Sequence, residues 1–198
     1  MNFQEIKNQI KTILQGKQTA AVMVSGGMDS GLLLYTCMTV KAEENFNTEI
    51  AVITVPRFDD SAVHSRRIVN WIESKFPYKI SVRESGNPMA HHSLQTWSGA
   101  VENFGKFNLI LMGCTTNPPN LPNGPLRPRV ARKDVFQPFY NLTKKDTVRL
   151  AIEAGLTDLM ELSHTCTESK LLRCGQCWQC KERAWGFEEN NYIDPGTM

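Results

Sequence analysis

Residues 20–35 read AAVMVSGGMDSGLLLY, an apolar stretch that runs into two adjacent glycines and then returns to apolar residues. The apolar residues before the glycines predict a β-strand, and those after Asp29 predict a helix. A turn from strand to helix gathers unpaired backbone N–H groups at a helix N-terminus, and glycines let an oxyanion approach that backbone closely. The stretch therefore predicts an anion-binding turn. A tight corner that Asp29 caps, with no ligand, is the alternative.

Further strands and helices alternate along the chain. Short apolar runs predict strands over 19–25, 49–55, 78–84 and 107–113, and the stretches between them predict helices over 31–44, 61–76 and 93–107. Helices are also expected over 1–15 and 142–155, the second capped by Thr143 and Asp146. This alternation predicts an α/β fold with an open, mostly parallel sheet and helices on both faces. Ligands of such sheets collect at the carboxyl ends of the strands, where the glycine turn and Gly113 both lie.

Length and composition predict one main domain with a small appendage. The chain has 198 residues, 41% of them hydrophobic, and a formal net charge of +2. So weak a charge gives no general attraction to nucleic acids or membranes, and no apolar run reaches the roughly 20 residues that a membrane span needs. Residues 1–15 read as an amphipathic helix rather than a signal peptide. We therefore expect a cytoplasmic protein with no membrane partner, and nucleic acid is not expected as a direct partner.

Residues 114–138 contain six of the ten prolines and predict a long irregular loop. Loops of this length in a compact domain are more often lids or substrate loops than plain connections. The loop carries a basic run, Arg127, Arg129, Arg132 and Lys133, that could close on phosphates or on an acidic substrate. A solvated loop without such a role is the alternative.

The spacing of the glycines excludes two common phosphate-binding motifs. The chain has no G-x-x-x-x-G-K-S/T segment, and Met28 takes the place of the second glycine in G-x-G-x-x-G. Asp29 would repel a bare anion, but it suits a phosphate that arrives with Mg²⁺. The turn is therefore neither a P-loop nor a dinucleotide-binding turn.

The stretch SGGMDS at 25–30 resembles the S-G-G-x-D-S motif of the PP-loop ATP pyrophosphatase family. The resemblance implies an adenine nucleotide alpha hydrolase-like fold, in which the loop holds the pyrophosphate of ATP while a substrate attacks the α-phosphorus. A late lysine of the family is matched by Lys144 in PFYNLTKKDTV, where a solvated lysine at a helix end is the alternative. ATP is thus the expected ligand, with Asp29, Ser30 and Lys144 as catalytic residues. The implied nucleotide-binding residues are Ser25, Gly26, Gly27, Asp29, Ser30 and Lys144.

Four of the six cysteines crowd into residues 166–180. Cys174, Cys177 and Cys180 recur at every third residue, and Cys166 precedes them. Two residues between cysteines let a turn bring both sulfurs onto one metal ion. Nearby basic residues offset the charge of four thiolates: Lys170, Arg173, Lys181 and Arg183. The spacing predicts a structural Zn²⁺ site, and an iron–sulfur cluster or ordinary reduced cysteines are the alternatives.

The tail over 166–195 resembles the C-terminus of the 7-cyano-7-deazaguanine synthase family in its cysteine spacing and in the G-F-E-E and D-P phrases that follow. Gly113 in LILMG, expected to bind nucleotide, and L-T-K at 142–144 match the same family. The resemblance implies that ATP adenylates the carboxylate of 7-carboxy-7-deazaguanine, that ammonia forms an amide, and that a second activation dehydrates the amide to the nitrile. An RNA-thiolating PP-loop enzyme and a non-catalytic nucleotide-binding protein are the alternatives.

Segments that would border the acceptor pocket depart from that family's phrases. His91 stands in NPMAHH where the family has an asparagine, and the loop after Gly113 lacks the usual aspartate. Substrate contacts are expected from His91, Arg132 and Lys133, and loop histidines without a role are the alternative. We expect a nucleotide-binding α/β domain over 1–160 with a zinc-binding helical segment over 161–198 packed on it. A homodimer is compatible with this organisation.

Overall fold

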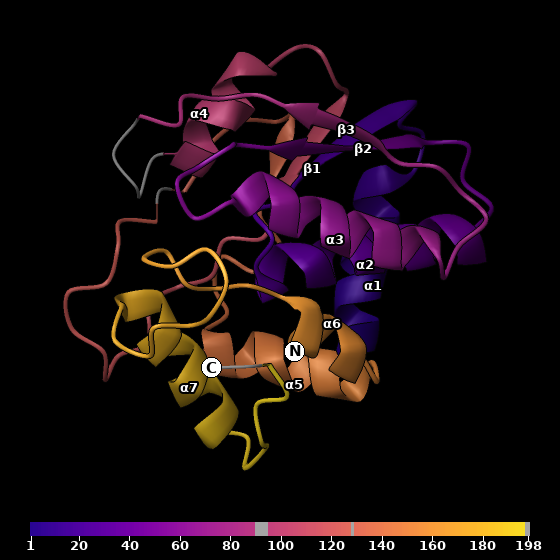
Figure 1. The fold of residues 1–198 in the computed structure, drawn as a ribbon. Coiled ribbons are helices and arrows are strands. Elements are labelled where there is room, and N and C mark those ends of the chain that lie inside the picture. Colours follow the sequence, from indigo (N-terminus) through magenta and orange to yellow (C-terminus); the bar gives the residue numbers. More distant parts are fainter. Residues whose placement is uncertain (90–94, 128, 197–198) are drawn as a thin grey trace.

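The computed structural model describes residues 1–89, 95–127 and 129–196, and in that part of the chain five parallel strands form one sheet (Figure 1). The strands are β1 (Thr19–Met23), β2 (Glu49–Thr54), β3 (Ser81–Glu84), β4 (Leu109–Met112) and β5 (Val135–Phe136), in the order β3-β2-β1-β4-β5. From β1 the chain moves outward to β2 and β3 on one side, whereas β4 and β5 lie on the other. The order therefore reverses between β1 and β4, and a crevice is expected at their carboxyl ends.

Helices cover the two faces of the sheet unequally (Figure 1). α4 (Gln95–Glu102) packs on one face, over a small core that includes Met23, Ala100 and Ile110. The larger core lies on the opposite face, and the other helices of the described residues all contribute to it. They are α1 (Phe3–Leu14), α2 (Met28–Glu43), α3 (Ser61–Glu73), α5 (Lys144–Glu153), α6 (Thr157–Leu162) and α7 (Trp178–Glu188).

The last helix is joined to the rest of the molecule through α5. Phe187 of α7 is buried in the larger core, and α7 packs along α5. Arg183 is fully buried and donates hydrogen bonds to the carbonyl oxygen of Met160, the hydroxyl of Ser163 and the carboxylate of Asp194. The domain boundary expected at residue 160 falls inside α6 and stays a prediction.

The predicted α/β class, parallel sheet and helices on both faces are confirmed. The predicted cap of α5 is also present, because the Asp146 carboxylate accepts a hydrogen bond of 2.9 Å from the backbone N–H of Thr143.

Several element boundaries were wrong. α2 begins at Met28 rather than at residue 31, since Gly27 is its N-cap, and α4 ends at Glu102 rather than at 107. The loop expected over 114–138 contains β5, whose two residues are too few for a periodic signal. α6 and α7 were not foreseen as separate helices; α6 has only six residues. Within the described ranges, every helix is too short or too polar to traverse a lipid bilayer.

Candidate active site

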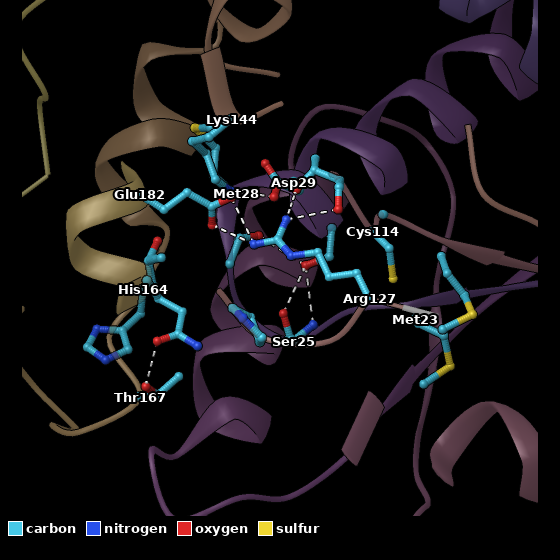
Figure 2. A pocket seen from close by; sticks show the side chains of 18 of the residues that line it. Met23, Ser25, Met28, Asp29, Cys114, Arg127, Lys144, His164, Thr167 and Glu182 are labelled. Carbon is cyan, nitrogen blue, oxygen red and sulfur yellow. Dashed lines mark hydrogen bonds and ion pairs between the residues drawn. The ribbon is translucent and has the colours of Figure 1, made fainter. Parts of the chain in front are cut away.

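A cavity of about 210 Å³ opens at the carboxyl ends of β1 and β4, where the strand order reverses (Figure 2). Met23, Trp97 and Met112 give it an apolar wall, which suits a flat ring. Gln179 and Glu182, one turn apart on α7, give it a polar wall. An apolar pocket with a few convergent polar groups is the usual form of a small-molecule site.

The glycine turn places the N-terminus of α2 at this cavity. Gly26 has φ +83°, and a Cβ added there would lie 2.4 Å from the Cβ of His64. The backbone N–H of Ser25 donates to Ser30 Oγ over 3.2 Å, and that hydroxyl donates to the carbonyl oxygen of Gly27 over 3.0 Å. These contacts fix the turn, and the N–H groups of the first turn of α2, which have no partner within the helix, form a site for an anion.

Asp29 and Lys144 form an ion pair beside the turn, although they lie 115 positions apart in the sequence. Asp29 lies in the first turn of α2 and Lys144 begins α5, whose Thr147 hydroxyl donates to the other Asp29 oxygen over 2.8 Å. A Cβ at Gly113 would lie 3.1 Å from the Asp29 backbone, and one at Gly186 would lie 2.6 Å from the Lys144 side chain, so both glycines permit the close packing. Lys144 is only 4% exposed, and a buried cation at a helix N-terminus is suited to phosphate oxygens.

Arg127 and Glu182 form a second ion pair in the cavity (Figure 2). Nη2 of Arg127 donates to both carboxylate oxygens of Glu182, over 2.8 Å each, and Nη1 donates to the carbonyl oxygen of Thr115 over 3.0 Å. The side chains of Arg127 and Glu182 are 17% and 3% exposed. Arg127 belongs to the predicted basic run. Glu182 was missed, because it stands among other charged residues and its spacing matches no known motif.

The other expected substrate residues do not gather at the cavity. Arg132 pairs with Asp134 through two hydrogen bonds of 2.8 Å, and its guanidinium lies 4.0 Å from the ring centre of Phe104. Neither Arg132 nor Lys133 is among the residues that line the cavity. His91 lies outside the described residues. The substrate roles of these three residues stay predictions.

Two histidines that the sequence analysis missed support the glycine turn. The rings of His64, on α3, and His164 stack with their centres 4.0 Å apart, and the backbone N–H of His164 donates to the carbonyl oxygen of Gly26 over 2.9 Å. Nε2 of His64 lies 2.8 Å from the carbonyl oxygen of Lys170, and Nε2 of His164 lies 2.7 Å from that of Ser169, so each ring donates through Nε2. Burial lowers the pKa of His64, and the neighbouring His164 ring lowers it further.

The four predicted metal ligands meet in the structure. The sulfur atoms of Cys166, Cys174, Cys177 and Cys180 all lie within 4.8 Å of one another, which fits an ion held by metal–sulfur bonds of about 2.3 Å. Hydrogen bonds from the backbone N–H groups of Cys177 and Gln176 lower the pKa of Cys174 to about 6, whereas burial raises the pKa of Cys166 and Cys180. All six cysteines lie in the described part of the chain and are unpaired, so these four could hold a metal ion.

The segment that carries these cysteines has known relatives. Residues 128–191 match the model of the family described as queuosine biosynthesis protein QueC. The C-terminal third of the chain is QueC-like. Relatives named 7-cyano-7-deazaguanine synthase include one from Chromobacterium violaceum, 37% identical over 65 residues, and one from Laribacter hongkongensis, 40% identical over 65 residues. Each match covers 33% of this chain but only 28% of the relative's length.

Beyond the QueC-like segment, the fold has solved counterparts. The NAD+ synthetase from Burkholderia pseudomallei has a TM-score of 0.50 over 77% of this chain and 66% of its own, at 13% identity. The U34-tRNA thiolase NcsA from Methanococcus maripaludis, with its 4Fe–4S cluster, has a TM-score of 0.53 over 94% of this chain and 72% of its own, also at 13% identity. At such identity the likeness shows the fold alone, and it agrees with the α/β fold expected from the alternating strands and helices.

Proposed function

We propose that the protein is an ATP-dependent ligase that adenylates the carboxylate of 7-carboxy-7-deazaguanine and uses ammonia to form 7-cyano-7-deazaguanine, with AMP and pyrophosphate released. The observation that carries the proposal is the pairing of buried Lys144 with Asp29 at the N-terminus of α2, beside the cavity. The QueC-like tail supports the choice of acid, because relatives with this tail are named for the nitrile product.

The chain's own residues fit the activation of a carboxylate. An oxygen of the acid attacks the α-phosphorus of ATP, a new P–O bond forms, and the bond to the bridging oxygen breaks to release pyrophosphate. Lys144 and the N–H groups of the glycine turn would hold the charge that develops on this pyrophosphate. Ammonia then attacks the activated carbonyl carbon, AMP leaves with the electrons of the C–O bond, and the nitrogen loses a proton to give the amide. A second ATP would adenylate the amide oxygen in the same way, and loss of AMP and of the remaining N–H protons gives the nitrile. Binding both reactants in one cavity would supply much of the rate.

The donor atoms suggest which ions would fit. Four thiolates would hold Zn²⁺, and such a closed site has no open coordination position, so the ion would support α7 rather than take part in chemistry. Asp29 would contact Mg²⁺ that accompanies the phosphates through lone pairs that its two oxygens keep beside their hydrogen bonds from Lys144 and Thr147. A homodimer, a cytoplasmic location and the boundary at residue 160 remain predictions from the sequence.

Lys144→Met tests the proposal. We expect it to lower the rate of AMP formation from ATP, ammonium and 7-carboxy-7-deazaguanine by roughly 100-fold or more, since it removes a charge-stabilising group. Lys145→Met is the matched control, because Lys145 is the next residue and is exposed, with an ion pair to Glu189 on the surface. Circular dichroism establishes that both variants are folded. Absence of AMP and nitrile with the wild-type chain would overturn the proposal.

The metal separates this proposal from the RNA-thiolation alternative. Protein purified without oxygen should be colourless and contain about one zinc ion per chain, as a tetrathiolate zinc site requires. A brown protein with iron and sulfide would favour the iron–sulfur alternative.

A further inference from the structure

The Arg127–Glu182 pair uses only part of the hydrogen-bonding capacity of the arginine. Both oxygens of Glu182 share the single nitrogen Nη2, and Nη1 is used by Thr115. Among the described residues, Nε of Arg127 has no hydrogen-bond partner. The Nε and Nη2 groups of an arginine form an edge with two parallel N–H donors, and this edge is the one that best matches a carboxylate. Glu182 therefore occupies one of the two donor groups of that edge, Nη2.

Glu182 cannot easily withdraw from this position. It lies two residues after the metal-ligand candidate Cys180 and directly before Arg183, which is fully buried and bonded to Met160, Ser163 and Asp194. One turn later Gly186 packs against Lys144. The backbone of α7 is thereby fixed, and the Glu182 carboxylate, with its side chain 3% exposed, is held in the cavity.

Arg127 lies close to the groups proposed for the reaction. Its guanidinium is anchored to Thr115, two residues after Gly113 at the end of β4, and both Thr115 and Arg127 line the cavity with Asp29 and Lys144. Figure 2 shows the Arg127 side chain extending into the cavity towards Glu182, with Asp29 and Lys144 in the same region.

We propose that Arg127 binds the carboxylate of the acid that is to be activated on its Nε–Nη2 edge, and that the fixed Glu182 carboxylate competes with this acid for Nη2. The inference rests on the proposed function and assigns its acceptor specificity. A substrate carboxylate that docks on the Nε–Nη2 edge competes with the Glu182 oxygens for Nη2, and the two anions repel each other. Glu182 is therefore an internal competitor that sets how strongly a carboxylate must bind before it is accepted.

A competing role and a purely structural role of Glu182 predict opposite effects of Glu182→Gln on binding of the acid. If the pair only held the loop over 114–134 closed, removal of either charge would loosen the loop and weaken substrate binding. If Glu182 competes with substrate, Glu182→Gln removes the repulsion and strengthens binding of the acid, whereas Arg127→Gln weakens it.

The test uses the full zinc-loaded chain and measures KM separately for 7-carboxy-7-deazaguanine and for ATP. We expect Arg127→Gln to raise KM for the acid roughly tenfold or more through loss of a charge-assisted bidentate contact, with KM for ATP within about twofold of wild type. Glu182→Gln should lower KM for the acid about threefold or more. In the double variant Arg127→Gln/Glu182→Gln, the second substitution should no longer lower KM. Arg127→Lys keeps the charge but loses the fork, so its KM should be intermediate. Glu189→Gln, in an exposed pair with Lys145 at the end of α7, is the control.

Two results would overturn the inference: a Glu182→Gln chain with a raised KM for the acid, or an Arg127→Gln chain whose KM rises equally for acid and ATP. Both presuppose a wild-type chain that makes AMP from the acid. A folded wild-type chain that makes none overturns the proposed function, and this inference falls with it. Thermal unfolding of each variant separates loss of fold from loss of binding.

Discussion

The two adjacent glycines of the turn have different steric environments. Gly26 has φ +83°, a conformation that L side chains rarely adopt, and a Cβ there would lie 2.4 Å from the Cβ of His64. Gly27 has φ −82°, and the atom nearest to a Cβ there would be Ser25 Oγ at an ordinary 3.5 Å. Both glycines belong to the sequence motif, but only Gly26 is required by backbone conformation and close packing.

Substitution of the two glycines should therefore give unequal losses of stability. We expect Gly26→Ala to lower the free energy of unfolding by about 2 kcal/mol or more, because a positive φ costs an L residue roughly 1–2 kcal/mol and His64 must also move. Gly27→Ala, the matched control, should change it by about 0.5 kcal/mol or less. Urea unfolding measures both. Equal stabilities for the two variants would show that the turn relaxes around the added methyl group.

The residues of the site differ in how far the sequence reveals them. Asp29 and Lys144 could be predicted because each stands in a local motif, and the parallel sheet brings the two motifs to one edge. Glu182 and His164 could not be predicted. Both line the cavity only because the chain after α6 folds back onto α5 and the glycine turn, and such contacts leave no periodic mark in the sequence.

At the scale of elements, His64 joins α3 to the turn and to the loop before α7. Its ring stacks on His164 and hydrogen-bonds to the carbonyl oxygen of Lys170, whose side chain pairs with Asp60 at the start of α3. Burial, His164 and Arg67 lower the pKa of His64, while the bond to Lys170 and the charge of Asp59 oppose this. The folded protein therefore favours the neutral ring.

This shift predicts that the protein loses stability in mild acid. An unfolded chain takes up a proton at His64 near pH 6.5, whereas the folded chain takes it up only at lower pH, so the unfolded state binds more protons in between. The stability that His64 contributes is present above about pH 6.5 and is lost as the pH falls towards the folded pKa. The Tm of wild type should fall between pH 7.5 and 5.5, and that of His64→Gln should fall less. Loss of metal in acid affects both proteins, so the difference isolates His64; equal slopes would contradict the prediction.

The metal site should stabilise the element that presents Glu182 and Arg183. Cys177 is the N-cap of α7 and Cys180 lies in its first turn, so an ion held by both would fix the start of this helix. We expect Cys177→Ser to lose zinc and to become sensitive to protease from about residue 160 onward, because binding energies of structural zinc reach about 10 kcal/mol or more. Activity should fall in step with soluble folded protein. Gln176→Ala, at an exposed neighbour, is the control.

A Cys177→Ser chain that stays folded and zinc-loaded but forms no AMP would give a different answer. The cysteines would then take part in the reaction, and the RNA-thiolation alternative would gain support.

At the scale of the whole molecule, alternating apolar runs were enough to predict the sheet and its two covered faces. The four strands expected from these runs are present, and each has at least four residues. β5 has two residues and α6 has six, and elements this short form through tertiary contacts rather than through their own pattern. Whether the chain divides into two units at residue 160 could not be predicted in this way, because it depends on packing between the segments before and after that residue.

The packing argues that both parts of the chain unfold together. Phe187 completes the larger core, Gly186 contacts Lys144, and buried Arg183 bonds to groups on both sides of the predicted boundary at residue 160. Loss of α7 would remove Phe187 from the larger core and Gly186 from its contact with Lys144, so the two parts stabilise each other. We expect one cooperative transition in the zinc-loaded chain.

The four tryptophans provide the measurement, because Trp71 and Trp97 precede residue 160 whereas Trp178 and Trp185 follow it. A chain with Trp71→Phe and Trp97→Phe reports on the C-terminal part by fluorescence, and a chain with Trp178→Phe and Trp185→Phe reports on the rest. Circular dichroism of each variant gives its own global midpoint and corrects for the substitutions. In both chains the fluorescence and dichroism midpoints should coincide, as an all-or-none transition requires. A C-terminal fluorescence transition at lower urea than the dichroism of the same chain would instead establish 161–198 as a separate unit.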